Sequence, residues 1–222
     1  MFTALDCLVA QARARGGGPV RWVVSRPTDE HDQAAAATGL TERRDLFQLR
    51  RPLPVEPAAR AGAPSIATRA LRPGTADEAA WIEQNNRSFA HHPDQGGQTL
   101  DSMHATMAEP WFDPDGLRLM FQDGQLVGSC WTRIHPAGED QLDDPALGEI
   151  FVIGVHPAHG GKGLGAALVL DGLAWLHAHG LDLGMLYVDA DNAPALRLYD
   201  RLGFTRHHVD RVYDGTVSAS RR

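Results

Sequence analysis

The sequence predicts an α/β fold in which helices flank a mixed central sheet, and three observations carry this prediction. A β-branched and aromatic run at residues 150–155 leads through a glycine-rich turn into an apolar helix over residues 164–179. A strand–helix–strand unit follows over residues 185–213. Asp123-Gly124 separates two apolar runs, which is a strong hairpin signal. Hairpins together with a strand–helix–strand unit favour a mixed sheet covered by helices.

Residues 1–53 are predicted to contain four elements. A helix over residues 1–15 has one apolar stripe, formed by Phe2, Leu5, Leu8, Val9 and Ala12. A strand is expected at residues 20–24, then a helix through Thr38 that Thr28 or Asp29 can cap, then a strand at residues 43–50. Residues 54–64 read as a linker, because their prolines disfavour both a helix and a central strand.

The rest of the chain is predicted to begin with a strand at residues 66–71. Thr75 and Glu78 have the spacing of a capping box that opens a helix through residue 90, and Thr99 caps a second helix over residues 100–108. A polar loop over residues 91–98 separates these helices. The hairpin strands follow at residues 117–121 and 126–134, then an acidic surface loop over residues 136–145. A frayed tail is expected at residues 218–222.

The bulk composition argues against nucleic acid as the main partner and against a membrane helix. The 222 residues are 43% hydrophobic and carry a net charge of −7, which argues against nucleic acid as a main partner. Cys7 and Cys130 form no metal or redox spacing, so a reduced, cytoplasmic compartment is expected. No apolar run approaches the roughly 18 residues of a membrane helix, and the first residues do not resemble a signal peptide.

The glycine-rich turn predicts an anion site. Gly160, Gly161, Gly163 and Gly165 stand at the start of the apolar helix, where unpaired backbone N–H groups can point at a phosphate. Lys162 is followed by glycine instead of the Ser or Thr of a P-loop, and the third glycine of a dinucleotide fingerprint is missing at its spacing. An acetyltransferase loop and glycines needed for packing alone are the other two interpretations. Glycine costs about 1 kcal/mol in a helix, which disfavours packing alone.

Residues beyond the turn carry a resemblance to a known family. Residues 161–166 (GKGLGA) resemble motif A of the GNAT N-acetyltransferases. Motif B of the same family is similar to a downstream set of positions, at residues 186–188, 191–192, 195, 198–199 and 202–204. The chain also resembles the mycothiol synthase family of GNAT enzymes in five further stretches. These are NNRSF (85–89), HPDQGG (92–97), EPWFDP (109–114), WTR (131–133) and GEIFVIGV (148–155).

This resemblance implies a domain organisation. Members of that family resemble two GNAT domains in tandem, and residues 65–217 correspond to a complete one, after the linker at residues 54–64. Residues 1–53 repeat the element order of residues 164–213 and correspond to the second half of an N-terminal GNAT domain whose first half is lacking. Because a half domain leaves strand edges unpaired, we expect it to pack on the second domain or on another chain. A poorly ordered extension is the alternative.

The resemblance also implies an acetyl-CoA site. The backbone of Ile153, Gly154 and Val155 would bind the pantetheine arm, and an N–H near Ile153 would polarise the thioester carbonyl. The implied pyrophosphate site consists of Gly160, Gly161, Lys162, Gly163, Leu164, Gly165 and Ala166. The implied far wall consists of Asn192, Ala193, Pro194, Ala195, Leu196 and Arg197. The superfamily usually has Gln or Arg where Gly160 stands, so one side-chain contact is missing, while Lys162 keeps a positive charge there.

Two residues are the catalytic candidates by resemblance. Glu149 would accept the proton of the acceptor amine, directly or through water, and Tyr199 would protonate the departing thiolate. A solvent-facing Glu at a strand end and a tyrosine that only packs are the alternatives. The acceptor-binding candidates are Asp94, Arg133, Glu149 and Tyr187, each of which could instead be an ordinary surface or packing residue.

The expected function is acetylation of the cysteinyl amine of Cys-GlcN-inositol, also called desacetylmycothiol, by acetyl-CoA. The alternatives are a GNAT enzyme for another small amine or a peptide N-terminus, and a non-catalytic acetyl-CoA-binding module. No metal is expected, because His177, His179, His207 and His208 lack a carboxylate or thiolate at ligand spacing. A monomer or a homodimer is expected.

Overall fold

The computed structural model describes residues 3–92, 95–139 and 143–219, which divide into two compact units. Unit 1 contains residues up to Leu49 together with residues 187–197 and those from Thr205 onward. Unit 2 contains residues 50–186 and 198–204. The units therefore cut across the division into residues 1–53 and 65–217 that the sequence suggests.

Eight strands are hydrogen-bonded in the order β1-β8-β2-β7-β6-β5-β4-β3. The strands are β1 (Gly17–Ser25), β2 (Thr41–Pro52), β3 (Arg69–Ala70), β4 (Leu117–Gln122), β5 (Gln125–His135), β6 (Leu147–Val155), β7 (Leu183–Asp189) and β8 (Thr205–Ser218). The β4–β5 and β5–β6 pairs are antiparallel, whereas β6 and β7 run parallel. The helices are α1 (Thr3–Ala14), α2 (Asp29–Ala37), α3 (Pro57–Arg60), α4 (Ala76–Ser88), α5 (Leu100–Met107), α6 (Leu164–Ala178) and α7 (Ala193–Arg201). The α/β fold with a mixed sheet is confirmed.

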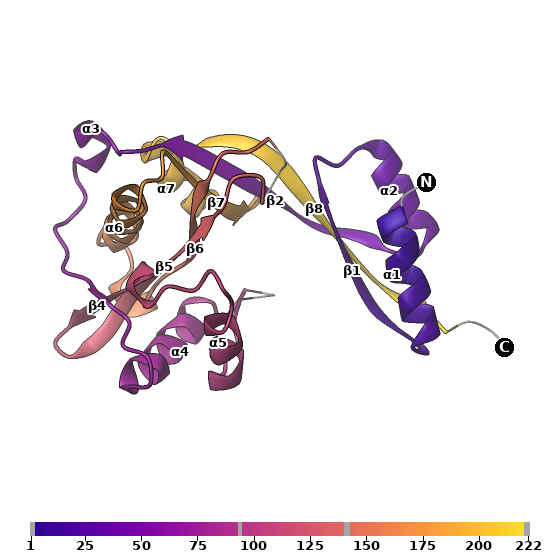
Figure 1. Ribbon diagram of the computed structural model, residues 1–222, viewed down its shortest axis with the longest axis horizontal. Helices are drawn as coiled ribbons and strands as arrows, with labels where there is room; N and C mark the ends of the chain where they lie inside the picture. The colour runs from indigo at the N-terminus through magenta and orange to yellow at the C-terminus, as the bar shows by residue number, and fades with distance from the viewer. Residues whose placement is uncertain (1–2, 93–94, 140–142, 220–222) are drawn as a thin grey trace. The chain divides into compact units, whose positions relative to one another are not determined.

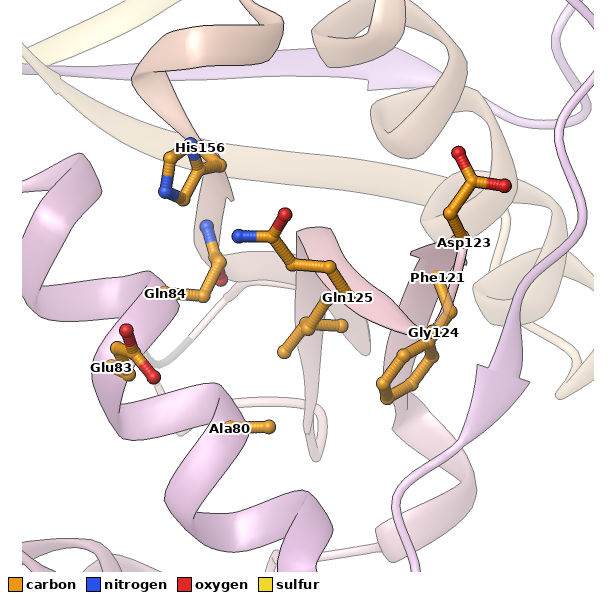
Figure 2. Close-up of a pocket in the computed structure, with 9 residues that line it drawn as sticks. Ala80, Glu83, Gln84, Phe121, Asp123, Gly124, Gln125 and His156 are labelled. Atoms are coloured by element: carbon orange, nitrogen blue, oxygen red, sulfur yellow. The ribbon is translucent and has the colours of Figure 1, made fainter.

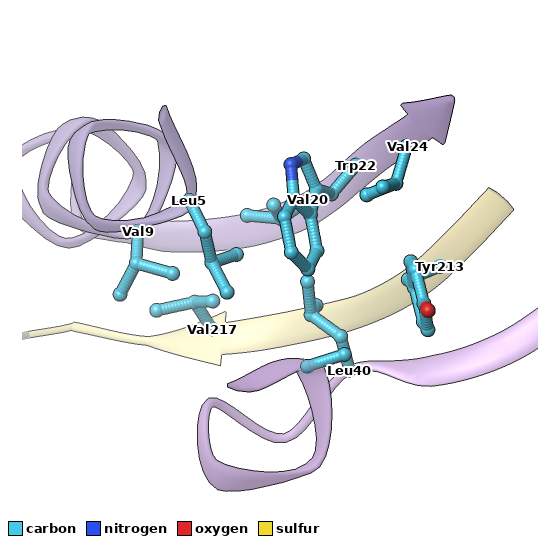
Figure 3. Packing of buried hydrophobic residues seen from close by; sticks show 9 residues of the cluster. Leu5, Val9, Val20, Trp22, Val24, Leu40, Tyr213 and Val217 are labelled. Atoms are coloured by element: carbon cyan, nitrogen blue, oxygen red, sulfur yellow. The ribbon is translucent and has the colours of Figure 1, made fainter. Parts of the chain in front are cut away.

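Unit 1 has its own apolar core. Strand β1 pairs with β8 from Gly17↔Ser218 to Ser25↔Asp210, which is why β8 continues past the expected end at residue 213. Leu5 and Val9 of the predicted α1 stripe are buried against this pair. Figure 3 shows them beside Trp22 of β1, whose ring stacks on Tyr213 of β8 at a centroid distance of 5.2 Å.

Unit 2 places α6 on one face of strands β4–β6 and the α4–α5 pair on the other (Figure 1). Glycines bring α6 close to the sheet, since a Cβ on Gly172 would lie 2.6 Å from the Cys130 sulfur. On the opposite face, Trp81 of α4 meets Trp131 of β5 edge-on, with centroids 5.1 Å apart. None of the helices in the described ranges is long and apolar enough to cross a bilayer.

Three local predictions need correction. Residues 57–60 of the linker form the one-turn helix α3, because proline at the first helical position removes no needed N–H. The strand expected at residues 66–71 is reduced to Arg69–Ala70, and the Thr68 hydroxyl instead donates to Asp171 of α6. Thr75 does cap α4, but Glu78 accepts from the backbone N–H of Gly74, so the capping box is incomplete.

An ion pair anchors the first turn of α4. Both guanidinium nitrogens Nη1 and Nη2 of Arg69 contact the Asp77 carboxylate, at 2.5 and 2.7 Å, and the Arg72 N–H donates to it at 3.1 Å. Chiefly through Arg69, these contacts lower the pKa of Asp77 below its ordinary value of 3.8. The stabilisation is therefore present at pH values above about 4 and is lost as pH falls through the lowered pKa.

Asp77→Asn is expected to reduce the free energy of unfolding at pH 7 by about 1 kcal/mol, a small value because Arg69 is partly exposed to solvent. The difference from wild type should shrink between pH 4 and pH 3, as urea titrations at both pH values would show. Asp101→Asn, at the exposed first turn of α5, is the matched control and should have little effect at either pH. A difference that stays constant with pH would contradict the assignment.

Candidate functional site

The glycine-rich turn between β6 and α6 is an exposed loop whose backbone only glycine adopts without strain. After a 3₁₀ turn at Pro157–His159, Gly161 and Gly163 have φ values of +75° and +76°. Gly163 is the N-cap residue of α6. Residues 160–163 are all exposed, and Lys162 lies between the two left-handed glycines. The loop therefore presents its backbone to solvent.

The loop leaves a row of backbone donors available. The N–H of Gly160 donates to the Pro157 carbonyl, and the N–H of Ala167 donates to the Gly163 carbonyl. For the N–H groups between them, from Gly161 to Ala166, no acceptor is present within the described parts of the chain. Unpaired N–H groups at a helix N-terminus carry partial positive charge and suit a phosphate.

Strand β6 reaches this loop with one open edge. Its pairing with β7 covers Gly148↔Gly184 and Glu149↔Met185, and within unit 2 the rest of β6 pairs with β5 alone. The β5 register places Trp131 opposite Val152 and Thr132 opposite Ile150, so Phe151 is an extra residue, a β-bulge. A bulge bends its strand, which is consistent with the end of pairing to β7 at this point.

The register also decides which backbone groups of β6 face this open edge. The N–H of His156 donates to Val127 of β5, and alternate residues of an antiparallel strand face the same neighbour. Gly154 therefore faces β5, whereas Ile153 and Val155 direct their N–H and C=O groups away from it. The Val155 carbonyl already accepts a 3.0 Å hydrogen bond from the Ser88 hydroxyl of α4. A Cβ on Gly154 would lie 2.9 Å from the amide nitrogen of Gln84, so this glycine also permits close packing of α4.

Two candidate acceptor-binding residues, Arg133 and Glu149, lie directly opposite each other on β5 and β6. Cross-strand partners share a face of the sheet, and His135, two residues from Arg133, shares it too. Glu149 is only 7% exposed, and its Oε2 lies 2.8 Å from Nε2 of His135. The Arg133 guanidinium lies over the Trp111 ring, 4.9 Å from its centroid, and pairs with Glu139. Glu149 is thus a buried and partnered carboxylate, not a strand-end residue facing solvent.

Tyr199 lies in α7 and is 7% exposed. Burial, with a smaller contribution from Cys130, raises the pKa of its hydroxyl to about 12. Its ring packs against Phe204 with centroids 5.7 Å apart. The phenol is therefore protonated at neutral pH, as a proton donor must be.

The remaining predicted site residues belong to unit 1 or lie outside the described residues. Residues 192–197 open α7 in unit 1, where the Asn192 side chain accepts from the Ala195 N–H at 3.2 Å. Tyr187 is in unit 1 as well, and its hydroxyl accepts a 2.7 Å hydrogen bond from Gln48. Asp94 lies outside the described residues.

Two pockets adjoin β6. The larger, of about 370 Å³, lies between α4 and the β4–β5 hairpin (Figure 2). His156 is among its lining, and Nε2 of this residue is buried without a hydrogen-bond partner in the described structure. Of the predicted site residues that lie in the described ranges, none lines this pocket. The smaller, of about 200 Å³, is lined by Phe151 and Val152 at the bulge and by Trp81 and Trp131. Trp131 shares a sheet face with Arg133, so the smaller pocket is the better candidate for part of an acceptor site.

His135, Glu139 and Ser88 were not singled out from the sequence, although they contact predicted site residues. Alternation along β5 could have placed His135 on the face of Arg133. Its contact with Glu149, however, depends on the β5–β6 register, which the bulge at Phe151 shifts. Ser88 lies within a stretch that carries the family resemblance, but nothing in its spacing indicates a bond to the Val155 carbonyl.

The family model described as Acetyltransferase (GNAT) family matches residues 80–204. A mycothiol acetyltransferase of Thermomonospora curvata is 45% identical over 207 residues, which cover 93% of this chain and 67% of that protein. A mycothiol acetyltransferase of Catenulispora acidiphila is 42% identical, covering 94% of this chain and 65% of that protein. A crystal structure of a GCN5-related N-acetyltransferase from Sphaerobacter thermophilus has a TM-score of 0.71 at 22% identity, covering 98% of this chain and 65% of that one. The chain thus spans about two thirds of the length of these proteins.

Gly163→Ala is expected to weaken binding of coenzyme A at least tenfold in calorimetric titrations. Its left-handed φ strains any residue with a Cβ, and the added atom would lie 3.0 Å from Pro64. Gly165→Ala is the matched control, since its Cβ would be in ordinary 3.7 Å contact with Leu198, and it should bind as wild type does. Equal binding by both variants would show that the left-handed turn is not needed for the ligand.

Proposed function

The chain belongs to the GNAT acetyltransferase family, and from this premise we propose that it transfers the acetyl group of acetyl-CoA to the cysteinyl amine of desacetylmycothiol. The products are mycothiol and coenzyme A. The observation that carries the acyl-transfer part is the row of free N–H groups from Gly161 to Ala166 beside the open edge of β6. The acceptor is inferred from the 42–45% identity to mycothiol acetyltransferases over nearly the whole chain.

On the donor side, the amides of residues 160–166 bind the pyrophosphate, and Lys162 adds positive charge. The outward C=O of Ile153 and the outward N–H of Val155 hold the pantetheine amides, which leaves the N–H of Ile153 for the thioester oxygen. Gly154 contributes by allowing α4 to approach, since its own backbone groups face β5. Residues 192–197 are proposed as the far wall by family resemblance.

On the acceptor side, the face of β5 and β6 that carries Arg133 and Glu149 receives the amine. The smaller pocket at the bulge offers aromatic walls, with the amide side chains of Asn85 and Gln98 among its lining. Such a mixture suits a ligand with sugar and inositol rings, which present apolar faces and hydroxyl edges. Asp94 and Tyr187 are proposed as further acceptor contacts by resemblance alone.

The chemistry needs one proton acceptor and one proton donor. Glu149 accepts a proton from the acceptor ammonium group, and the freed amine attacks the thioester carbonyl, whose oxygen is stabilised by the N–H of Ile153. When the carbon–sulfur bond breaks, Tyr199 protonates the thiolate and recovers the proton that the nitrogen loses as the amide forms. A phenol with a pKa of about 12 keeps its proton until a strong base develops beside it.

Glu149→Gln and Tyr199→Phe are each expected to lower kcat by about 10²–10⁴, because each removes a group that transfers a proton in the transition state. The dissociation constant for acetyl-CoA should stay near the wild-type value in calorimetry. Tyr213→Phe, which removes a buried hydroxyl bonded to Asp32 in unit 1, controls for loss of a tyrosine hydroxyl as such. Wild-type turnover in either site variant would remove that residue from the proposed mechanism.

The proposed function is tested by incubating the protein with acetyl-CoA and desacetylmycothiol, other small amines or a peptide with a free N-terminus. Coenzyme A is quantified by chromatography and the acetylated product by mass spectrometry, since the acceptor's own thiol would disturb a thiol assay. Preference for desacetylmycothiol is expected. Turnover of another amine alone would assign a different acceptor, and acetyl-CoA binding without any turnover would indicate a non-catalytic module.

A further inference from the structure

His135 is the hydrogen-bond partner of Glu149. It ends β5, is 7% exposed, and brings Nε2 to 2.8 Å from Oε2 of the equally buried Glu149. A carboxylate only accepts hydrogen bonds, so Nε2 carries the hydrogen and donates it. No other described side chain or backbone group bonds to this carboxylate, and its Oε1 has no partner in the described structure.

The other side of the imidazole faces a second carboxylate. Nδ1 of His135 lies 3.8 Å from Oε1 of Glu139, on the loop that follows β5. Arg133 neutralises Glu139 from the same strand and is itself stacked on Trp111. The same loop is held by the Gly138 N–H bond to the Asp144 carbonyl, and Arg50 pairs with the Asp144 side chain. Within the described ranges, Glu149 and Glu139 are the carboxylates within 4 Å of the imidazole, and Arg133 reaches it only through Glu139.

Burial makes this bond consequential. A polar group removed from water needs a hydrogen-bond partner, and the partner of Glu149 is the His135 side chain. A single donor at Oε2 also fixes the orientation of the carboxylate, so that Oε1 remains free to receive the amine proton.

We propose that His135 is the positioning residue for Glu149, holding it as an oriented carboxylate with one oxygen available to the acceptor amine. The proposal rests on the proposed acetyl transfer, because Glu149 has this task only if an amine is the acceptor. His135 transfers no proton itself in this assignment. It acts through the bond between Nε2 and Oε2 alone.

The test compares His135→Gln with His135→Ala. The amide nitrogen of glutamine lies about as far along the side chain as Nε2 of histidine, so Gln can restore a neutral donor, whereas Ala cannot. His135→Ala should lower kcat about 10–100-fold, the usual effect of losing a hydrogen bond to a charged group. His135→Gln should recover most of this loss. KM for acetyl-CoA should change little in either variant.

The split between kcat and KM, and the rescue by Gln, separate positioning from a merely structural role. A carboxylate without its donor is no longer held toward the amine, so kcat per folded molecule should fall in His135→Ala while KM for acetyl-CoA stays near the wild-type value. In His135→Gln, kcat per folded molecule should return most of the way to wild type. A variant that only folded less well would lose rate in proportion to its folded fraction, measured by circular dichroism.

The variants and the wild type are assayed with an amine that the wild type acetylates. Failure of the wild type with desacetylmycothiol tests the proposed function, whereas the ratio of variant to wild-type rates tests this inference. Wild-type kcat in His135→Ala would overturn the inference. So would a loss that follows the folded fraction, or equal impairment of the Gln and Ala variants in kcat per folded molecule. Absence of turnover by the wild type with every amine would also overturn it, because Glu149 would then have no proton to accept.

Discussion

Strand β6 leaves part of its backbone edge without a strand partner inside its own unit, and the candidate site depends on this constraint. Pairing with β7 covers Glu149↔Met185 and the residue before it, and the bulge at Phe151 follows immediately. Backbone N–H and C=O groups must find partners when water is excluded. Ile153 and Val155 therefore have backbone polar groups on this edge, and the N–H groups from Gly161 to Ala166 also have no acceptor in the described structure. A site made of backbone groups relies on conformation, which is why left-handed glycines occur in the loop.

The two faces of the β4–β6 sheet differ in packing and in polarity. Toward α6, glycines at positions 128, 148 and 172 allow side chains to pack within van der Waals distance, so the strands are held firmly from that side. Toward α4, the alternate residues include Trp131, Arg133 and Glu149, together with Ser129, whose hydroxyl donates to the Gln84 side chain. Side chains alternate between the two faces along each strand, which produces this division. The face toward α6 is tightly packed and apolar, and the face toward α4 carries the polar side chains.

Helix α7 is anchored at the end that carries Tyr199. The Arg51 side chain, buried in unit 2, donates to the Leu202 carbonyl at the end of that helix and to the Pro52 carbonyl, and it contacts Glu56. A buried guanidinium must satisfy its donors, and the carbonyls at a helix C-terminus are natural acceptors. The segment that follows α7 is thereby tied to the last residues of β2.

The sequence by itself determined the α/β class, the hairpin at Asp123-Gly124, the glycine-rich turn before α6 and the family, because these follow from local spacing, turn chemistry and motifs. It also indicated Glu149 and Tyr199 as candidates, but not their burial. Only the tertiary structure decided that β3 shrinks to two residues, that β8 continues to Ser218, and that Glu78 bonds Gly74 instead of completing a capping box. It likewise decided that His135 holds Glu149 and that Gly154 faces β5, since both depend on a register shifted by one bulged residue. Contacts between strands are set by pairing over long sequence separations, which local patterns do not encode.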